Sequence, residues 1–121
     1  MTIEADFRAL LAGYAGVTAL VGSRIAQNAV PDAAGLPCIV FTATHTRYLT
    51  LNNTVDADQA AISVQCWAET AAAADAVADA VVAAVATAPA AAGAVVLDRA
   101  SAYDPEMGLD ATALTVEWWA T

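Results

Sequence analysis

The sequence predicts a single α+β domain, 1–121, with a mainly antiparallel sheet, a long hairpin and helices packed on one face. Two stretches repeat apolar residues every three or four positions, as amphipathic helices do. Others alternate apolar with polar residues or are rich in β-branched and aromatic ones, as strands are. The length of 121 residues suits one hydrophobic core, and no linker or repeat divides the chain.

The N-terminal part predicts a helix from about Thr2, with Gly13 near its end as a left-handed cap. The apolar residues of this helix recur at helical spacing and form one stripe: Phe7, Leu10, Leu11 and Tyr14. A second short helical turn, 17–21, stops at Gly22, and a short strand is expected within 24–30.

The middle of the chain predicts a long antiparallel hairpin built from strands 37–49 and 59–68. In the first strand, threonines alternate with other residues: Thr42, Thr44 and Thr46 against Phe41, Ala43 and His45. The segment Leu51–Asp56 contains turn-forming residues, so we expect it to form the exposed tip of the hairpin.

The C-terminal part predicts a helix from the cap Thr70 to about Ala88, with a stripe of alanine and valine that permits close packing on a sheet. Strands 95–102 and 109–119 follow, joined by a turn. In the last strand Trp118 and its neighbour Trp119 face opposite sides. One indole therefore belongs to the core, and the other needs cover from this chain or from another chain.

The charge balance argues against non-specific DNA binding. The chain has thirteen acids and four arginines but no lysine, and its net charge is −9. Non-specific DNA binding depends on cations that displace counterions from phosphates, so we do not expect this chain to bind DNA. The acidity serves solubility or marks a surface that DNA slides past. The alanine-rich segment 71–94 is interrupted by acids and a proline, so no membrane association is expected.

No catalytic, cofactor-binding or metal-binding residue is predicted, and the chain is not expected to be an enzyme. His45 is the single histidine, and Cys38 lies an odd number of positions away, so the two should face opposite sides of one strand. Cys66 could serve as a nucleophile only if it shared the face of His45 and reached solvent. One histidine and two cysteines also lack the short paired spacings of a zinc site.

Asp75 and Asp79 lie one helical turn apart and therefore repel each other mildly. Two alternatives remain for this pair. The carboxylates lie on a solvated helix face, or they meet an arginine of a neighbouring subunit, such as Arg24 or Arg47.

Four short segments stand out by their apolar residues and their spacing: Ala19–Ile25, Leu36–Phe41, Ile62–Thr70 and Tyr103–Leu109. Together they resemble the tail-completion (tail-terminator) family of long-tailed bacteriophages and phage-like gene transfer agents. The resemblance covers the chain from about Phe7 to Trp118. The chain departs from what the family leads us to expect in its lack of lysine and its high alanine content.

The resemblance implies a structural virion protein that forms a ring, typically a hexamer, at the head-proximal end of the tail tube. Such a ring ends tube polymerisation and joins the tail to the connector or stopper protein of the head, and DNA passes through its lumen. The resemblance places the protein in the neck of the particle, after assembly in the host cytoplasm. Two alternatives stay open: another head–tail connector component, such as a stopper or neck protein, and a small intracellular enzyme or ligand-binding domain.

A ring that closes by rotation needs two different, complementary patches on every subunit. The hairpin is our candidate for one patch, because it should project from the sheet and expose apolar residues. The candidate contacts with a subunit or with the tail tube are Arg47, Tyr48, Leu51, Asn52, Asn53, Asp56 and Trp119.

The charge balance yields a first prediction. The purified protein should not shift duplex DNA in a gel at physiological salt, because its four dispersed arginines are outnumbered by thirteen acidic residues. A mobility-shift titration repeated at several salt concentrations measures this. Tight binding that weakens steeply with added salt would contradict the charge argument.

Overall fold

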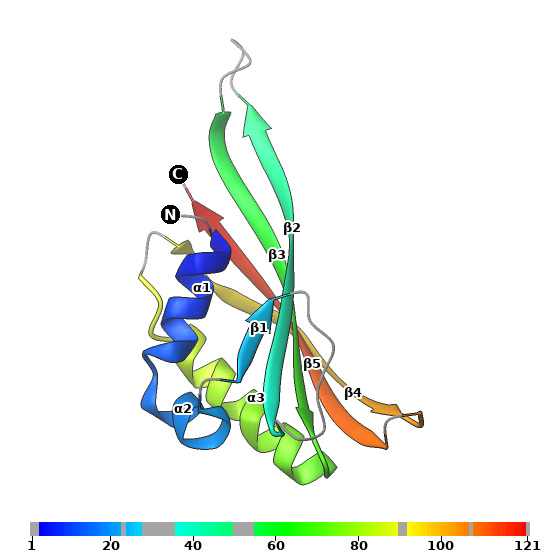
Figure 1. The fold of residues 1–121 in the computed structure, drawn as a ribbon. Coiled ribbons are helices and arrows are strands. Elements are labelled where there is room, and N and C mark those ends of the chain that lie inside the picture. Colours follow the sequence, from blue (N-terminus) through cyan, green and yellow to red (C-terminus); the bar gives the residue numbers. More distant parts are fainter. Residues whose placement is uncertain are drawn as a thin grey trace.

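Three helices lie against one face of a five-stranded sheet, as the ribbon shows (Figure 1). This computed structural model describes residues 3–22, 24–27, 36–49, 55–89, 92–106 and 108–120, without the side chains of 47–49, 55–58 and 120. The helices are α1 (Ile3–Ala12), α2 (Ala15–Val21) and α3 (Ala71–Val85). The strands are β1 (Ile25–Gln27), β2 (Cys38–Leu49), β3 (Val55–Ala68), β4 (Val95–Asp104) and β5 (Leu109–Ala120).

The sheet has the strand order β1-β2-β3-β5-β4. All neighbouring strands are antiparallel except β1, which pairs in parallel with the first part of β2. The predicted α+β class and the long hairpin are therefore confirmed. The β2–β3 hairpin extends well beyond the helical layer, and the β4–β5 hairpin extends in the opposite direction (Figure 1).

The predicted helix ends are partly wrong. Gly13 does not take a left-handed conformation; its N–H donates to the carbonyl of Ala9 at 2.9 Å and so extends the helical turn. Of the two glycines near the helix ends, Gly22 is the one with a positive φ, 60°, and it ends α2. Thr70 caps α3 as predicted, because its hydroxyl accepts a hydrogen bond from the N–H of Ala73. The expected cap Thr2 lies outside the described residues.

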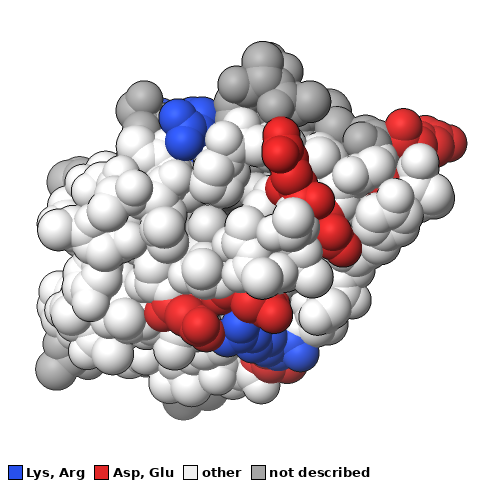
Figure 2. Space-filling model, turned by 90° about the horizontal axis from the view of Figure 1, so that it is seen from below, with Lys and Arg blue, Asp and Glu red and all other residues white. Residues whose placement is uncertain are grey.

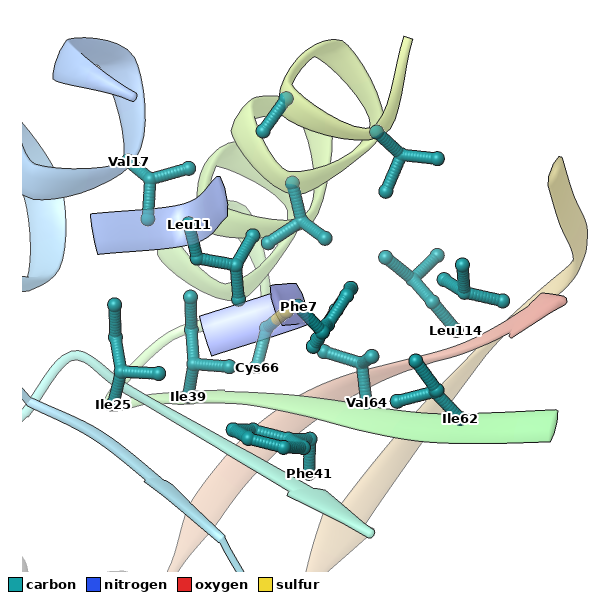
Figure 3. Packing of buried hydrophobic residues seen from close by; sticks show 14 of the residues in the cluster. Phe7, Leu11, Val17, Ile25, Ile39, Phe41, Ile62, Val64, Cys66 and Leu114 are labelled. Carbon is teal, nitrogen blue, oxygen red and sulfur yellow. The ribbon is translucent and has the colours of Figure 1, made fainter. Parts of the chain in front are cut away.

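The core lies between the helices and the sheet (Figure 3). Phe7 of α1 is fully buried and meets Phe41 of β2 and Trp118 of β5, both in edge-to-face geometry. The ring centroids are 5.2 Å and 5.9 Å away, which is the favourable range for aromatic pairs. One indole of the tryptophan pair is therefore in the core, as predicted, and the structure shows that it is Trp118.

Arg24 joins the end of α2 to the start of β2. Its Nε donates to the carbonyl of Pro37 at 2.9 Å, and its Nη2 reaches the carbonyl of Leu20 at 3.4 Å. The backbone carbonyl of Arg24 accepts a hydrogen bond from Ile39. Two of the segments that carry the family resemblance, 19–25 and 36–41, are therefore in direct contact.

None of the described helices is long and apolar enough to cross a bilayer.

The aromatic contacts of Phe7 yield a stability prediction. Phe7→Ala should lower the free energy of unfolding by about 3–5 kcal/mol, because it removes a fully buried ring and leaves a cavity. Leu20→Ala is the control, since Leu20 is 38% exposed and the change should cost about 1 kcal/mol or less. Denaturant unfolding measures both values. Equal losses in the two variants would show that Phe7 does not anchor α1.

Candidate functional site

The far end of the β2–β3 hairpin carries most of the candidate contact residues. Arg47 and Tyr48 lie near the end of β2, and Asp56 lies near the start of β3, so strand pairing brings these three together. The register shifts between Tyr48 and Leu49, which makes Asp56 the extra residue of a β-bulge. Three further candidates lie outside the described residues: Leu51, Asn52 and Asn53.

Trp119 lies beside the outer half of this hairpin, because it is opposite Gln59 in the pairing of β5 with β3, and Gln59 in turn is opposite Thr46 of β2. Its indole is partly buried, and Nε1 donates to Oε1 of Glu117 at 2.8 Å. Part of the cover comes from Gly93, where a Cβ atom would stand 3.2 Å from the indole Cδ1. Gly93 also has a φ of 52°, so both its conformation and this close approach require glycine.

One side-chain pair ties the hairpin to the helical layer. His45 of β2 contacts the carboxylate of Glu4, in the first turn of α1, through its Nε2 atom. The Glu4 side chain is only 17% exposed, so this pair lies partly beneath the surface. The single histidine of the chain therefore holds α1 against the hairpin instead of standing beside a nucleophile.

Neither cysteine offers a reactive thiol. Cys66 shares the sheet face of His45, but it is fully buried and lies opposite Ile39, six residues along β2 from His45. Burial is the main cause that raises its pKa to about 12. Cys38 faces the other side of the sheet and is also buried. Among the described residues, no group of three or more metal-ligating side chains comes together.

Asp75 and Asp79 meet an arginine, but it is Arg99 of the same chain. Nη1 of Arg99 donates to Oδ1 of Asp79 at 2.7 Å, and Nη2 donates to the backbone carbonyl of Asp75 at 3.3 Å. The hydroxyl of Thr112 donates to Oδ1 of Asp75 at 2.7 Å. Figure 2 shows one group of basic and acidic side chains in contact, on a face that carries other acidic and basic side chains separately. This cluster pins α3 to β4 and β5, an arrangement that the sequence did not predict.

The hydrogen bond from Thr112 is the main cause that lowers the pKa of Asp75, and Arg99 lowers this pKa further. The neighbouring Asp79 in turn raises the pKa of Arg99. Thr112 itself is only 2% exposed, so its hydroxyl is buried and satisfied by Asp75. The lowered pKa keeps the Asp75 carboxylate ionised, and in this form it accepts the hydrogen bond that joins α3 to β5.

Strand β4 carries exposed apolar side chains that the sequence analysis did not single out. Val95, Leu97 and Tyr103 are 51%, 55% and 60% exposed. Leu97 is the extra residue of a bulge, because the register with β5 shifts between Val96 and Asp98. The segment 95–102 was predicted as a strand, but nothing in its sequence marks it as the edge of the sheet. Its position at the edge follows from the strand order alone.

The described residues thus form an α+β domain with a projecting hairpin and an exposed edge strand, and they contain no catalytic constellation. The family model described as "Tail completion protein gp17" matches residues 5–121, and the chain belongs to this family. A chain in the solved structure "Virion of native gene transfer agent (GTA) particle" has the same fold, with a TM-score of 0.76 at 14% sequence identity. The alignment covers 97% of this chain and 92% of that chain. No curated protein matches the sequence.

Family membership makes this chain a structural protein of a phage-type tail, which argues against an enzymatic role. The family resemblance expected from the sequence is confirmed over nearly the whole chain. The contact residues named from the sequence remain predictions, and four of the seven lie on described strands.

The Asp75 cluster yields a prediction on pH. The lowered pKa of Asp75 stabilises the fold above the ordinary value of 3.8, and this contribution is lost as the pH falls through the lower folded-state pKa. Thr112→Val should raise the pKa of Asp75 towards 3.8 and reduce this pH-dependent stability, because it removes the largest cause of the shift. NMR titration of the Asp75 carboxyl and thermal unfolding between about pH 6 and pH 2 measure both effects.

Thr115→Val serves as the control, because Thr115 lies on the same strand but on the opposite face of the sheet from Thr112. An unchanged titration of Asp75 in the Thr112 variant would refute the role of the hydroxyl.

Proposed function

We propose that the chain is a tail terminator, which forms a ring at the head-proximal end of the tail tube. The ring, taken as a hexamer, ends polymerisation of the tube protein and presents the surface that joins the connector or stopper protein of the head. The observation that carries this proposal is membership of the tail completion family over residues 5–121. The protein acts in the neck of the particle and is assembled in the host cytoplasm.

The hairpin provides one of the two patches that a head-to-tail ring requires. It projects beyond the helices (Figure 1), so it can reach a neighbour while the core stays intact. Its two strands pair continuously from Cys38 to Tyr48, which makes the projection stiff. Trp119 lies beside the outer half of the hairpin, where a neighbouring subunit or the tail tube can cover the part of the indole that is still exposed.

The charges support a lumen through which DNA passes without binding. Two of the four arginines are engaged within the chain: Arg24 with backbone carbonyls and Arg99 with Asp75 and Asp79. Such guanidinium groups are held away from phosphates by their own partners. With a net charge of −9, the subunit repels a polyanion more than it attracts one.

Deletion of the gene tests the proposal. Without a terminator, the tube keeps growing and cannot join the head, so electron micrographs should show filled heads beside unattached, often overlong tails. Unattached tails of normal length would indicate a connector or stopper protein instead. Normal, infectious or transducing particles would refute a role in tail completion altogether.

The hairpin yields a prediction of its own. Deletion of Asn52–Thr54 should leave the thermal unfolding temperature within a few degrees of the parent, since this segment lies between the paired ends of β2 and β3. The same deletion should reduce the fraction of joined particles, because it shortens the proposed contact. Glu106→Ala, in the exposed β4–β5 turn, is the control and should join normally. Full joining by the deletion variant would rule out the hairpin tip as a contact.

A further inference from the structure

The strands that the structure describes leave two edges of the sheet without a complete partner, one on each side. On β2, the short strand β1 pairs only with Ile39–Phe41, and no described strand pairs with that side of β2 from Thr42 to Leu49. At the opposite edge of the sheet, β5 is the only described strand that pairs with β4, Val95–Asp104. Unpaired strand edges present rows of N–H and C=O groups that attract another strand.

One hydrogen bond fixes which residues direct their backbone groups outward. The N–H of Ile39 donates to the carbonyl of Arg24 at 2.9 Å, so the backbone groups of Ile39 point away from β3. Successive residues of a strand point their N–H and C=O groups to opposite sides. Because the register of β2 with β3 is unbroken as far as Tyr48, Ala43 and Arg47 also direct their backbone groups to the open side.

The same reasoning crosses the sheet to β4. Ile39 lies opposite Cys66, Cys66 lies opposite Thr112, and Thr112 lies opposite Ser101. Antiparallel pairs alternate between residues that exchange hydrogen bonds and residues that point away from each other. Ile39 and Cys66 point apart, Cys66 and Thr112 bond to each other, and Thr112 and Ser101 point apart. The backbone groups of Ser101 therefore point outward, and those of Arg99 and Tyr103 do so by alternation.

The two sets of outward-pointing residues also share one face of the sheet. Ala43 packs against the core, and Arg99 contacts α3, so both side chains lie on the helical side. Residues that exchange hydrogen bonds in an antiparallel pair must have their side chains on the same face. The outward-pointing residues of the two edges share a face because the antiparallel part of the sheet has an even number of strands, namely β2, β3, β5 and β4.

Strand direction and stagger fit as well. β2 and β4 run in opposite directions, so a copy rotated about a ring axis presents its β2 antiparallel to β4. Strand pairing across the sheet places the middle of β4, at Arg99, level with Phe41 of β2. The middle of the open part of β2, 42–49, lies about five residues further along, which is about 17 Å. Over four strands, about 19 Å wide, this displacement corresponds to a strand tilt of roughly 40°, within the range of closed barrels.

We propose that the open edge of β2, 42–49, pairs with the β4 edge of a second copy of this chain, so that one continuous sheet runs around the ring. The inference rests on the proposed ring and names its second patch. Pairing also brings a neighbour onto the exposed side chains of β4, including Leu97 and Tyr103. A closed ring leaves none of these edges open, whereas a linear chain of copies leaves one at each end.

Cross-linking in purified particles tests the pairing. Thr44→Cys and Ala102→Cys place one exposed thiol on each edge, on the face opposite the helices. Facing or diagonal positions on paired strands lie about 5–8 Å apart, within reach of a short bismaleimide. The native Cys38 and Cys66 are buried and should react slowly. The double variant should give a ladder of covalent oligomers of this chain that stops at the ring size.

Thr44→Cys with Ala83→Cys is the control pair, because Ala83 is also exposed but lies on α3, on the other side of the sheet. This pair should give no ladder. The absence of a ladder from the Thr44/Ala102 pair, in particles that contain the chain and have joined tails, would overturn edge pairing. That result would not contradict the terminator role, because the gene deletion tests that role separately.

A backbone variant gives a second test. Ser101→Pro removes an outward N–H and spares the hydrogen bonds of β4 with β5, so the isolated protein should unfold within a few degrees of the parent. The fraction of joined particles should fall at least tenfold. Ser101→Ala keeps the N–H and should join far better than the proline variant. Normal joining by Ser101→Pro, or equal loss in both variants, would overturn the proposal.

Discussion

The contact of Phe7 with Phe41 and Trp118 is the constraint on which the rest of the structure depends. These two aromatic partners lie on β2 and β5, the strands on either side of β3, so one ring holds α1 across three strands. Edge-to-face pairs contribute about 0.5–1.5 kcal/mol beyond the area that they bury. The contact also sets where the first turn of α1 meets the hairpin, because Glu4 and His45 lie one turn of helix and four residues of strand further along.

Helix α3 is held in a different way. Its buried residues are alanines and valines, which remove little apolar surface from water for each residue. The small side chains let the helix lie close to the sheet, but they provide a weak hydrophobic anchor. The cluster of Asp75, Asp79, Arg99 and Thr112 adds directional contacts where the apolar ones are few. The high alanine content and the ionic cluster are therefore parts of one solution.

The sequence predicted the architecture well, because strand and helix periods depend on local alternation. The hairpin, the α3 cap at Thr70 and the burial of one of the two adjacent tryptophans all followed from such patterns. Strand order does not follow from local patterns. The exposed edge at β4 and the intrachain partner of Asp75 and Asp79 were missed, because both depend on β5 lying between β3 and β4. The left-handed glycine was misplaced at Gly13, since sequence alone does not show which of two nearby glycines has a positive φ.

The hydrogen bonds of Arg24 have a consequence for how this chain can change in length. They join the end of α2 to the start of β2, and the pairing of β1 with β2 holds the two ends of the segment between Gln27 and Leu36. Once the ends of a segment are fixed, each doubling of its length costs only about 0.6 kcal/mol in closure entropy. Insertions between Gln27 and Leu36 should therefore be tolerated, so relatives can differ greatly in length here while keeping the same sheet.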